Sequence, residues 1–261
     1  MIKKFLLVCT IFSAVFLTAC LDTEEKIVIN KNNSGDYTLT LDMSKMLAMM
    51  DQFGGQDSTK EKEKKDSTVF FKPYIDTSAA LSAREKALFR DGSIRMQVDE
   101  AEKEMKVIIH FPFKNISDLP EMKSSYLSVI DKLGISNKLG KNDSSAIEQA
   151  DADLSKNKNM LNPAEQAFAF AAAPGKISNT LVNKQLITDK LQNDSTMQML
   201  QQMSLMMGDM TYKTIIILPK PAKKYNGKEV QASADKKTLT FTTSLTDMLN
   251  RPEAAEYKVE Y

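Results

Sequence analysis

The stretch that decides the fold class is residues 26–41, KIVINKNNSGDYTLTL. An apolar run is followed by Asn, Ser and Gly, which favour turns, and then Tyr37, Leu39 and Leu41 alternate with polar residues. Alternation with a period of two is typical of a half-buried strand, because successive side chains point to opposite faces of a sheet. The stretch therefore predicts a β-hairpin near the N-terminus.

Apolar residues alternate with polar ones in several further segments, and in others they recur at intervals of three and four residues. The first pattern predicts strands and the second predicts amphipathic helices, because the two backbones repeat every two and every 3.6 residues. The further predicted strands are residues 69–71, 94–98, 105–113, 212–218, 230–234, 239–243 and 255–261. The predicted helices are residues 43–53, 82–91, 118–134, 164–173, 178–207 and 245–249.

Two pairs of residues match the capping box that begins a helix, in which a Ser, Thr or Asp is followed three residues later by Glu. These pairs are Ser82 with Glu85 and Asp118 with Glu121. A third helix start is indicated by Pro163, because proline is favoured at the first helical position. The capping residues therefore mark where three of the helices are expected to begin.

Strands at both ends of the chain and helices in its middle favour an α+β fold. We expect the N- and C-terminal hairpins to form one antiparallel sheet, with helices from the middle of the chain packed on one face. Residues 26–261 are expected to be a single domain, which carries a charged loop at residues 56–68 and a polar, low-complexity stretch at residues 135–162.

The composition is that of a globular chain, and it argues against several functions. The 261 residues are 42% hydrophobic and 26% charged, which suffices for a core. Lys and Arg number 35 against 34 Asp and Glu. Because nucleic-acid binding proteins usually carry an excess of basic residues, this balance argues against nucleic acid as a partner. With one His, two Cys and nine Gly, and no phosphate-binding or nucleophile motif, the chain is expected to be non-catalytic and to use no cofactor. His110 lies on a predicted strand without a second histidine to act with it.

The first twenty residues carry a targeting signal. Lys3 and Lys4 precede an apolar stretch at residues 5–17, which is too short to cross a bilayer as a helix. The stretch ends in Leu17-Thr18-Ala19-Cys20. These four residues resemble the lipobox of bacterial lipoproteins.

The resemblance implies that residues 1–19 are a signal peptide, cleaved between Ala19 and Cys20. It also implies that Cys20 carries a diacylglyceryl thioether and, on its amine, a further acyl chain, palmitate for example. These three acyl chains exceed the roughly two membrane signals that stable anchoring needs. Cleavage removes two lysines and Cys9, which leaves 33 basic and 34 acidic residues. Because the lipidated Cys20 is then the only cysteine, no disulfide stabilises the monomer.

Residues 20–25 are expected to be a lipidated, acidic tether. Asp22, Glu24 and Glu25 resemble the surface-export signal of Bacteroidota lipoproteins, and the Lys- and Asn-rich, Trp-free composition resembles that phylum. An ordinary solvated tether is the alternative. We expect the protein at the outer membrane, with the periplasmic or the surface side left open.

A methionine cluster is one candidate binding site. Met199, Met203, Met206, Met207 and Met210 share one face of the predicted helix. Clustered thioethers are ligands for Cu(I), so copper binding is one hypothesis. The favoured interpretation is that these side chains fill an irregular core or an apolar groove.

A second candidate is the Ala-rich helix predicted for residues 164–173. Phe168 and Phe170 would project from opposite sides of this helix. They would either line a cavity for an apolar ligand or dock on a partner protein. The favoured interpretation is a central helix buried under the sheet, since small residues allow close approach.

Together, these features predict a lipid-anchored envelope protein that binds an apolar ligand or a partner protein. Residues 211–250 resemble the lipid-interacting lipoprotein domain named for the mycobacterial protein LppM. The alternative is a structural or assembly lipoprotein of the outer membrane. A cavity of several hundred Å3 enclosed by residues 163–210 would favour ligand binding, whereas a filled core would favour assembly.

Overall fold

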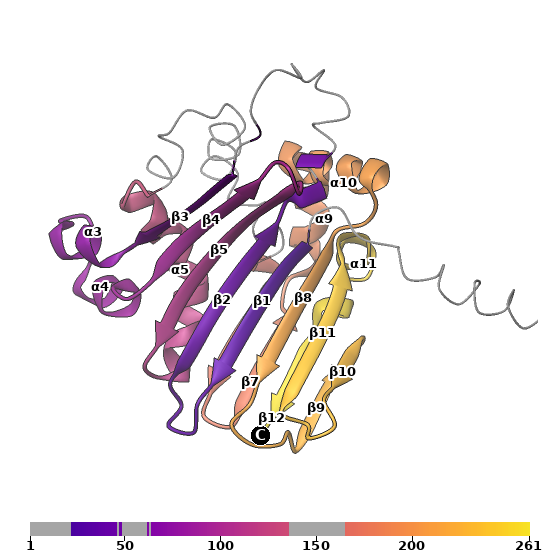
Figure 1. The fold of residues 1–261 in the computed structure, drawn as a ribbon. Helices are drawn as coiled ribbons and strands as arrows, with labels where there is room; N and C mark the ends of the chain where they lie inside the picture. The colour runs from indigo at the N-terminus through magenta and orange to yellow at the C-terminus, as the bar shows by residue number, and fades with distance from the viewer. Residues whose placement is uncertain (1–21, 46, 49–61, 63, 136–164) are drawn as a thin grey trace, which may run out of the picture.

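The fold is described from a computed structural model, which covers residues 22–45, 47–48, 62, 64–135 and 165–261. Figure 1 shows a broad twisted sheet with a smaller sheet and helices behind it. The strands of the large sheet, in spatial order, are β10 (Val230–Ala232), β11 (Thr238–Ser244), β8 (Thr211–Ile217), β1 (Asp22–Ile29), β2 (Gly35–Asp42), β5 (Glu104–Phe113), β4 (Ser93–Asp99) and β3 (Lys64–Phe70). The strands of the smaller sheet are β6 (Phe168–Ala173), β7 (Lys176–Leu181), β12 (Tyr257–Glu260) and β9 (Lys224–Gly227).

Helices connect and cover these strands. The α-helices are α3 (Lys72–Thr77), α4 (Ala83–Phe89), α5 (Leu119–Lys132), α9 (Lys184–Asn193), α10 (Ser195–Met207) and α11 (Leu245–Asn250). The short 3-10 helices are η1 (Ile116–Asp118), η2 (Glu165–Ala167) and η3 (Pro252–Ala255). In the described residues, no helix is both long and apolar enough to span a membrane.

The predicted α+β class is confirmed, because strands from both ends of the chain share the large sheet. They meet where β1 pairs with β8, with Asp22 opposite Thr211. This pair is parallel, whereas the other strand pairs of both sheets are antiparallel. The parallel junction was not expected, because only neighbouring hairpins leave a local signal in a sequence.

The N-terminal hairpin is confirmed as β1 and β2. Its turn holds Asn33 at a φ of 64°, in the left-handed region that Asn tolerates. Gly35 begins β2, and a Cβ at this position would lie 1.8 Å from the carbonyl oxygen of Val28. Only glycine permits this close approach between the two strands.

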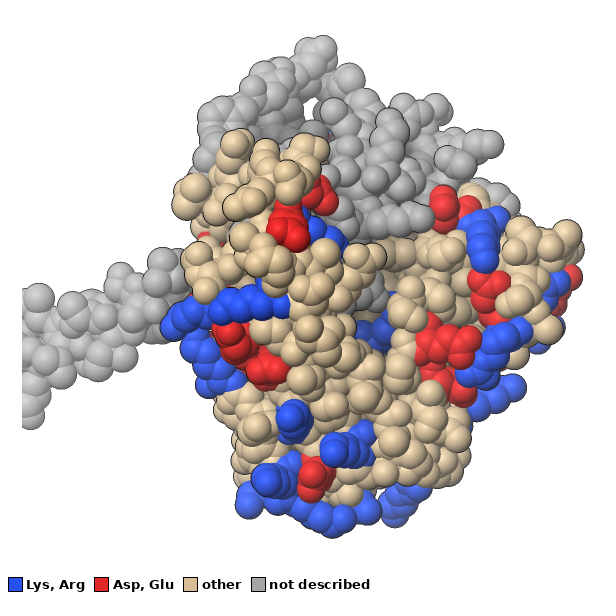
Figure 2. Space-filling view, turned by 180° about the vertical axis from the view of Figure 1, so that it is seen from behind, with Lys and Arg blue, Asp and Glu red and all other residues tan. Residues whose placement is uncertain are grey.

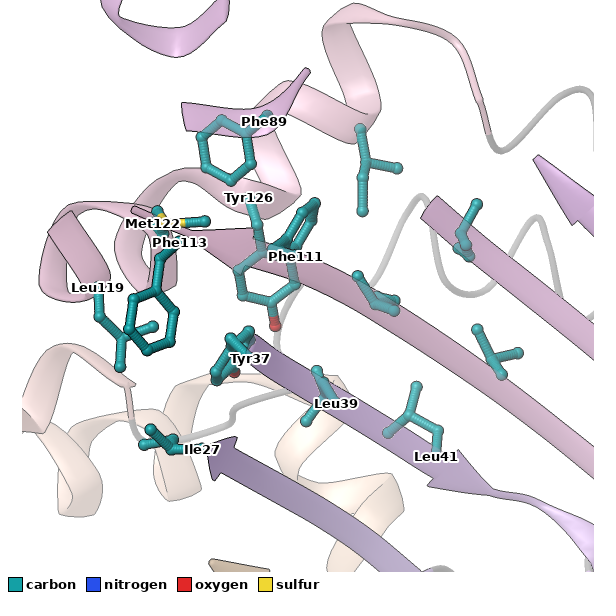
Figure 3. Packing of buried hydrophobic residues seen from close by; sticks show 14 of the residues in the cluster. Ile27, Tyr37, Leu39, Leu41, Phe89, Phe111, Phe113, Leu119, Met122 and Tyr126 are labelled. Carbon is teal, nitrogen blue, oxygen red and sulfur yellow. The ribbon is translucent and has the colours of Figure 1, made fainter. Parts of the chain in front are cut away.

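The core lies behind the large sheet, where one face of each strand carries apolar side chains. In β5, alternate residues from Met105 to Phe113 are buried, as the period of two predicts. The ring of Phe111 lies 5.0 Å from that of Phe89 and 5.5 Å from that of Phe71, both edge-to-face. Figure 3 shows Phe89, Phe111 and Tyr126 of α5 packed over β2 and β5.

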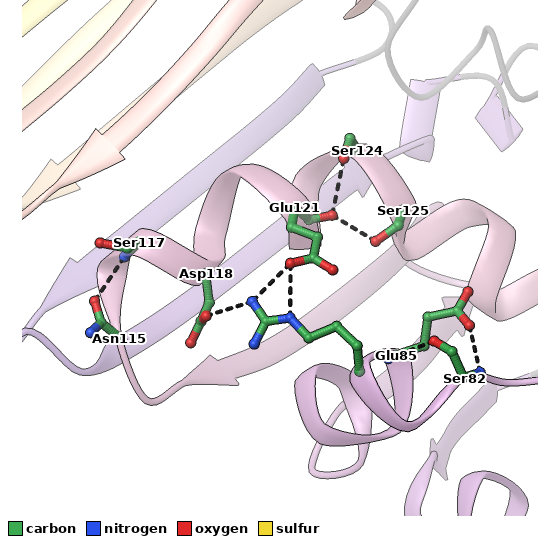
Figure 4. A network of polar contacts seen from close by, with 9 residues as sticks. Ser82, Glu85, Asn115, Ser117, Asp118, Glu121, Ser124 and Ser125 are labelled. Atoms are coloured by element: carbon green, nitrogen blue, oxygen red, sulfur yellow. Dashed lines mark hydrogen bonds and ion pairs between the residues drawn. The ribbon is translucent and has the colours of Figure 1, made fainter.

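The two predicted capping boxes have different outcomes. At α4 the box is complete, because Ser82 accepts from the Glu85 amide and Glu85 accepts from the Ser82 amide. The second prediction is wrong, since the side chain of Asp118 caps no amide of α5. The reason is that η1 runs directly into α5, so Asp118 is already helical; its carboxylate accepts from Arg84 instead. Both regions are drawn in Figure 4.

The segment at residues 164–173 is not a helix where the structure describes it. Residues 165–167 form η2 and residues 168–173 form β6, which pairs with β7 across a turn at Gly175. A short apolar run fits a buried helix and a strand equally well, and here the partner strand decides. The long helix predicted at residues 178–207 is also wrong at its start, because residues 178–181 complete β7 and the rest divides into α9 and α10.

Three boundaries also differ from expectation. Residues 22–25 belong to β1 and are not part of a tether, because both neighbouring strands hydrogen-bond to them. Residues 64–68 of the predicted charged loop are in β3, paired with β4. The last strand joins the smaller sheet, which the sequence did not predict. Most of residues 135–162 lies outside the described residues.

A candidate ligand cavity between the two sheets

A cavity of about 490 Å3 lies between the large and the smaller sheet. Its walls are formed by β1, β2, β8 and β11 on one side, by β6, β7 and β12 on the other, and by α5, α11 and η3 at the margins. Figure 2 shows the molecule from behind the large sheet; this face is hollowed near its middle, with basic side-chain atoms visible in the hollow.

Aromatic rings form much of the wall. Phe168 and Phe170 both line the cavity from β6. Because β6 is a strand, residues two apart share one face, so the rings lie on the same side and not on opposite sides as a helix would place them. Across the cavity, Phe241 of β11 stacks on Tyr257 of β12, with ring centroids 4.7 Å apart. The two sheets therefore meet through an aromatic contact beside the cavity.

A shielded ion pair forms the polar part of the wall. The ammonium of Lys123, from α5, contacts the carboxylate of Glu25, from β1, and the two side chains are only 12% and 14% exposed. Thr214 Oγ1 donates to the second carboxylate oxygen of Glu25 at 3.3 Å. Lys123 Nζ also lies 4.0 Å from the ring centroid of Phe170, a cation–π distance. Glu25 Oε1 accepts no well-aligned hydrogen bond, so its attraction to Lys123 is that of an ion pair.

Two hydroxyls in cavity-lining residues are buried without a hydrogen-bond partner in the described part of the chain. They are Tyr257 Oη and Thr243 Oγ1. An unsatisfied buried polar group costs about 1–3 kcal/mol. Burial, and secondarily the charge of Glu25, raise the pKa of Tyr257 well above its usual value, so this hydroxyl keeps its proton. Burial likewise raises the pKa of Tyr212, another lining residue.

The charges along the cavity balance. Three acidic and three basic residues line it, namely Glu25, Glu229, Glu256, Lys123, Lys213 and Lys228. Several are engaged outside the cavity: Lys213 lies 3.7 Å from Glu24, and the carboxylate of Glu256 accepts from the Leu181 amide. Since no sign of charge dominates, the cavity is suited to an uncharged ligand.

Residues 163–210 contribute to the cavity but do not enclose it. Within residues 163–210, the lining residues are Gln166, Phe168, Phe170 and Asn179. The remaining walls come from strands and helices elsewhere in the chain. Alternation predicted that Tyr37 and Leu39 of the N-terminal hairpin share one face, but no local signal indicated that two sheets would leave a space between them.

Met210 is the one residue of the methionine cluster whose side chain the structure describes, and it is not among the described residues that line the cavity. Met199, Met203, Met206 and Met207 lie in α10, and their side chains are outside what the structure describes. Met210 is 1% exposed and belongs to the core. Copper binding by this cluster stays a prediction. Ala19 and Cys20 also lie outside the described residues, so lipidation stays a prediction too.

Among the described residues, neither a metal-binding cluster nor His110 contributes to the cavity. Within those residues, no three His, Cys, Asp or Glu side chains gather in a way that would hold a metal ion. His110 Nε2 lies 3.0 Å from Asp36 Oδ1, and neither residue lines the cavity.

Comparison with known proteins adds no relative. The chain matches no protein-family model, no curated protein and no solved structure. The resemblances of residues 17–25 and 211–250 therefore stay predictions, and the cavity is the feature of this chain that bears on its function.

Proposed function

We propose that this chain is a lipid-anchored, non-catalytic protein of the cell envelope, and that it binds a small, mostly apolar ligand between its two sheets. The observation that carries the proposal is the cavity of about 490 Å3 with its aromatic walls. Ligand sites in proteins are typically about 300–1,000 Å3 and mostly apolar.

The polar groups point to an uncharged amphiphile. Lys123 already has Glu25 as its counter-ion, so an acidic ligand would have to compete for the ammonium and would meet the carboxylate. Among the described residues, the buried hydroxyls of Tyr257 and Thr243 find no hydrogen-bond partner. A ligand oxygen that a small movement brings to either hydroxyl would remove the cost of an unsatisfied donor. An ester, ketone or alcohol on an apolar chain meets these conditions.

A role in binding agrees better with these groups than a reaction does. General acid–base catalysis needs a group whose proton is readily gained or lost near neutral pH. The raised pKa of Tyr257 keeps its proton in place. This hydroxyl is therefore not poised to transfer a proton.

Native mass spectrometry of the processed protein, purified gently from its own membranes, tests the proposal. We expect acyl groups on Cys20 and a stoichiometric non-covalent mass of a small amphiphile. Ser124→Trp should abolish the non-covalent mass, because Ser124 is exposed at the cavity and a large ring there blocks it. Ser125→Trp is the matched control, since Ser125 is the next residue of α5 and does not line the cavity.

Other outcomes would overturn parts of the proposal. A wild-type protein without any bound mass would contradict ligand binding and favour the assembly role, which cross-linking in the envelope would then examine. Bound copper in place of an amphiphile would favour the methionine cluster. An unacylated chain would contradict the lipid anchor.

A further inference from the structure

The folded domain begins almost at the expected lipid anchor. β1 begins at Asp22, two residues after Cys20. An extended chain spans at most about 3.6 Å per residue, so the start of β1 lies within about 7 Å of the Cys20 Cα. The headgroup layer of one leaflet is itself about 5–7 Å thick. No room is left for a flexible tether between domain and membrane.

This short link decides which end of the molecule faces the anchor. Asp22 pairs with Asp42 at the end of β2 and with Thr211 at the start of β8. Thr211 in turn pairs with Ser244, the residue directly before α11. Helix α10 ends four residues before Thr211. Figure 1 shows α9, α10 and α11 grouped at the end of the sheet where β1 begins.

Helix α10 has a composition that suits contact with lipid. Its 13 residues include no Asp, Glu, Lys or Arg. Of the side chains that the structure describes, Met197 and Ser204 face the protein, whereas Gln198, Gln201 and Leu205 are exposed. Exposed residues separated by three, four and seven positions share one face of a helix. Leu205, on that face, is 81% exposed, which is unusual for a large apolar residue.

The acidic residues that flank α10 accept hydrogen bonds from groups within the protein. Asp194 Oδ1 accepts from the Met197 amide, and Asp209 Oδ1 accepts from Ser204 Oγ and from two backbone amides. At the end of β2, the carboxylate of Asp42 lies 3.7 Å from Lys106 Nζ. Lys106 therefore partly neutralises Asp42, whereas Asp194 and Asp209 keep their charge but are turned toward donors of the protein itself.

We propose that the domain stands directly on the membrane, with the exposed face of α10 in contact with the lipid headgroups and Leu205 inserted among them. The proposal rests on the lipid anchor of the proposed function. Contact of this helix face with the headgroups buries no charged side chain. The anchor also keeps the helix close to the membrane, which raises its effective concentration at the surface. The large sheet then extends away from the bilayer, and the turn between β1 and β2 is distal.

A single labelled cysteine tests this orientation. The mature chain has no free thiol, because Cys9 is removed and Cys20 is acylated, so Leu205→Cys can be labelled alone with a polarity-sensitive dye. The processed protein is inserted into vesicles of phosphatidylethanolamine and phosphatidylglycerol that contain a nitroxide-labelled lipid. The control is Lys31→Cys, which is exposed in the distal turn. The eight residues of β1 separate the two ends by about 25 Å.

We expect the nitroxide lipid to quench the dye at residue 205 several-fold more than the dye at residue 31. Equal quenching of both dyes in a protein that floats with the vesicles would overturn the orientation and leave the anchor standing. A protein that carries no acyl mass and stays in the aqueous phase would overturn the anchor, and the orientation with it.

Discussion

Glu25 and Lys123 both line the cavity and contribute to the stability of the fold. Glu25 lies on β1 and Lys123 on α5, and both are almost shielded from water. A buried ion pair is costly to form, so its net contribution to stability is small, but removal of one partner leaves an uncompensated buried charge. The cation–π contact of Lys123 with Phe170 extends the interaction to the smaller sheet.

Lys123→Met is therefore expected to destabilise the protein by about 3 kcal/mol, because the Glu25 carboxylate remains buried without its counter-ion. The double variant Glu25→Gln with Lys123→Met should recover most of this loss. Urea unfolding followed by circular dichroism measures both. If Lys123→Met were as stable as the wild type, the Glu25 carboxylate would have to be hydrated in solution.

At the scale of elements, α4 and α5 are joined by polar contacts that cross between them. Lys132 Nζ lies 2.6 Å from Glu85, whose other oxygen accepts from the Ser82 amide at 2.8 Å. Arg84 donates to Asp118 at 2.7 Å and to Glu121 at 2.9 Å. Figure 4 shows the caps and the contacts at Asp118 and Glu121. These contacts fix the helices that cover the aromatic core.

The stability that Glu85 contributes depends on pH. Its hydrogen bonds with Lys132 and with Ser82 lower its pKa from 4.5 to about 2. Because the pKa is lower in the folded state, the contribution is complete above about pH 4.5 and is lost as the pH falls through about 2. We expect the wild type to be about 1 kcal/mol more stable than Glu85→Gln at pH 7, and the two to converge near pH 2. Thermal unfolding across this range measures the difference; a gap independent of pH would contradict the assignment.

The element that the sequence predicted wrongly, β6, lies at the cavity. The run from Phe168 to Ala173 is apolar and Ala-rich, and Ala favours helices. The chain is a strand here because Gly175 adopts a φ of 83° and folds β7 back against it. The hydrogen bonds of that pairing and the burial of the two Phe rings outweigh the weak preference of Ala.

At the scale of the whole molecule, one hydrophobic core joins the two sheets. The buried cluster includes Ile27 of β1, Leu239 of β11, Ile177 of β7 and Val259 of β12. β1 lies in the middle of the large sheet, between β2 and β8. The stability of the N-terminal and C-terminal parts of the large sheet therefore depends on β1, which pairs with both.

This arrangement predicts cooperative unfolding. Ile27→Ala removes a fully buried side chain from β1 and should cost about 3 kcal/mol. Because β1 joins both parts of the sheet, far-ultraviolet circular dichroism and tyrosine fluorescence should give coincident transitions in urea for the wild type and the variant alike. Separate transitions would mean that the smaller sheet unfolds independently.

Local sequence patterns predicted those features of the fold that local interactions control. Alternation and turn residues predicted both hairpins of the N-terminal half, and Ser82 with Glu85 predicted the start of α4. The tertiary structure alone decided the parallel pairing of β1 with β8, the second sheet and the strand β6. The cavity follows from these, since Glu25 and Lys123 are 98 residues apart and only the packing of α5 against β1 brings them together. Long-range hydrogen bonds and the space left between packed layers depend on the whole chain, and no short stretch of sequence records them.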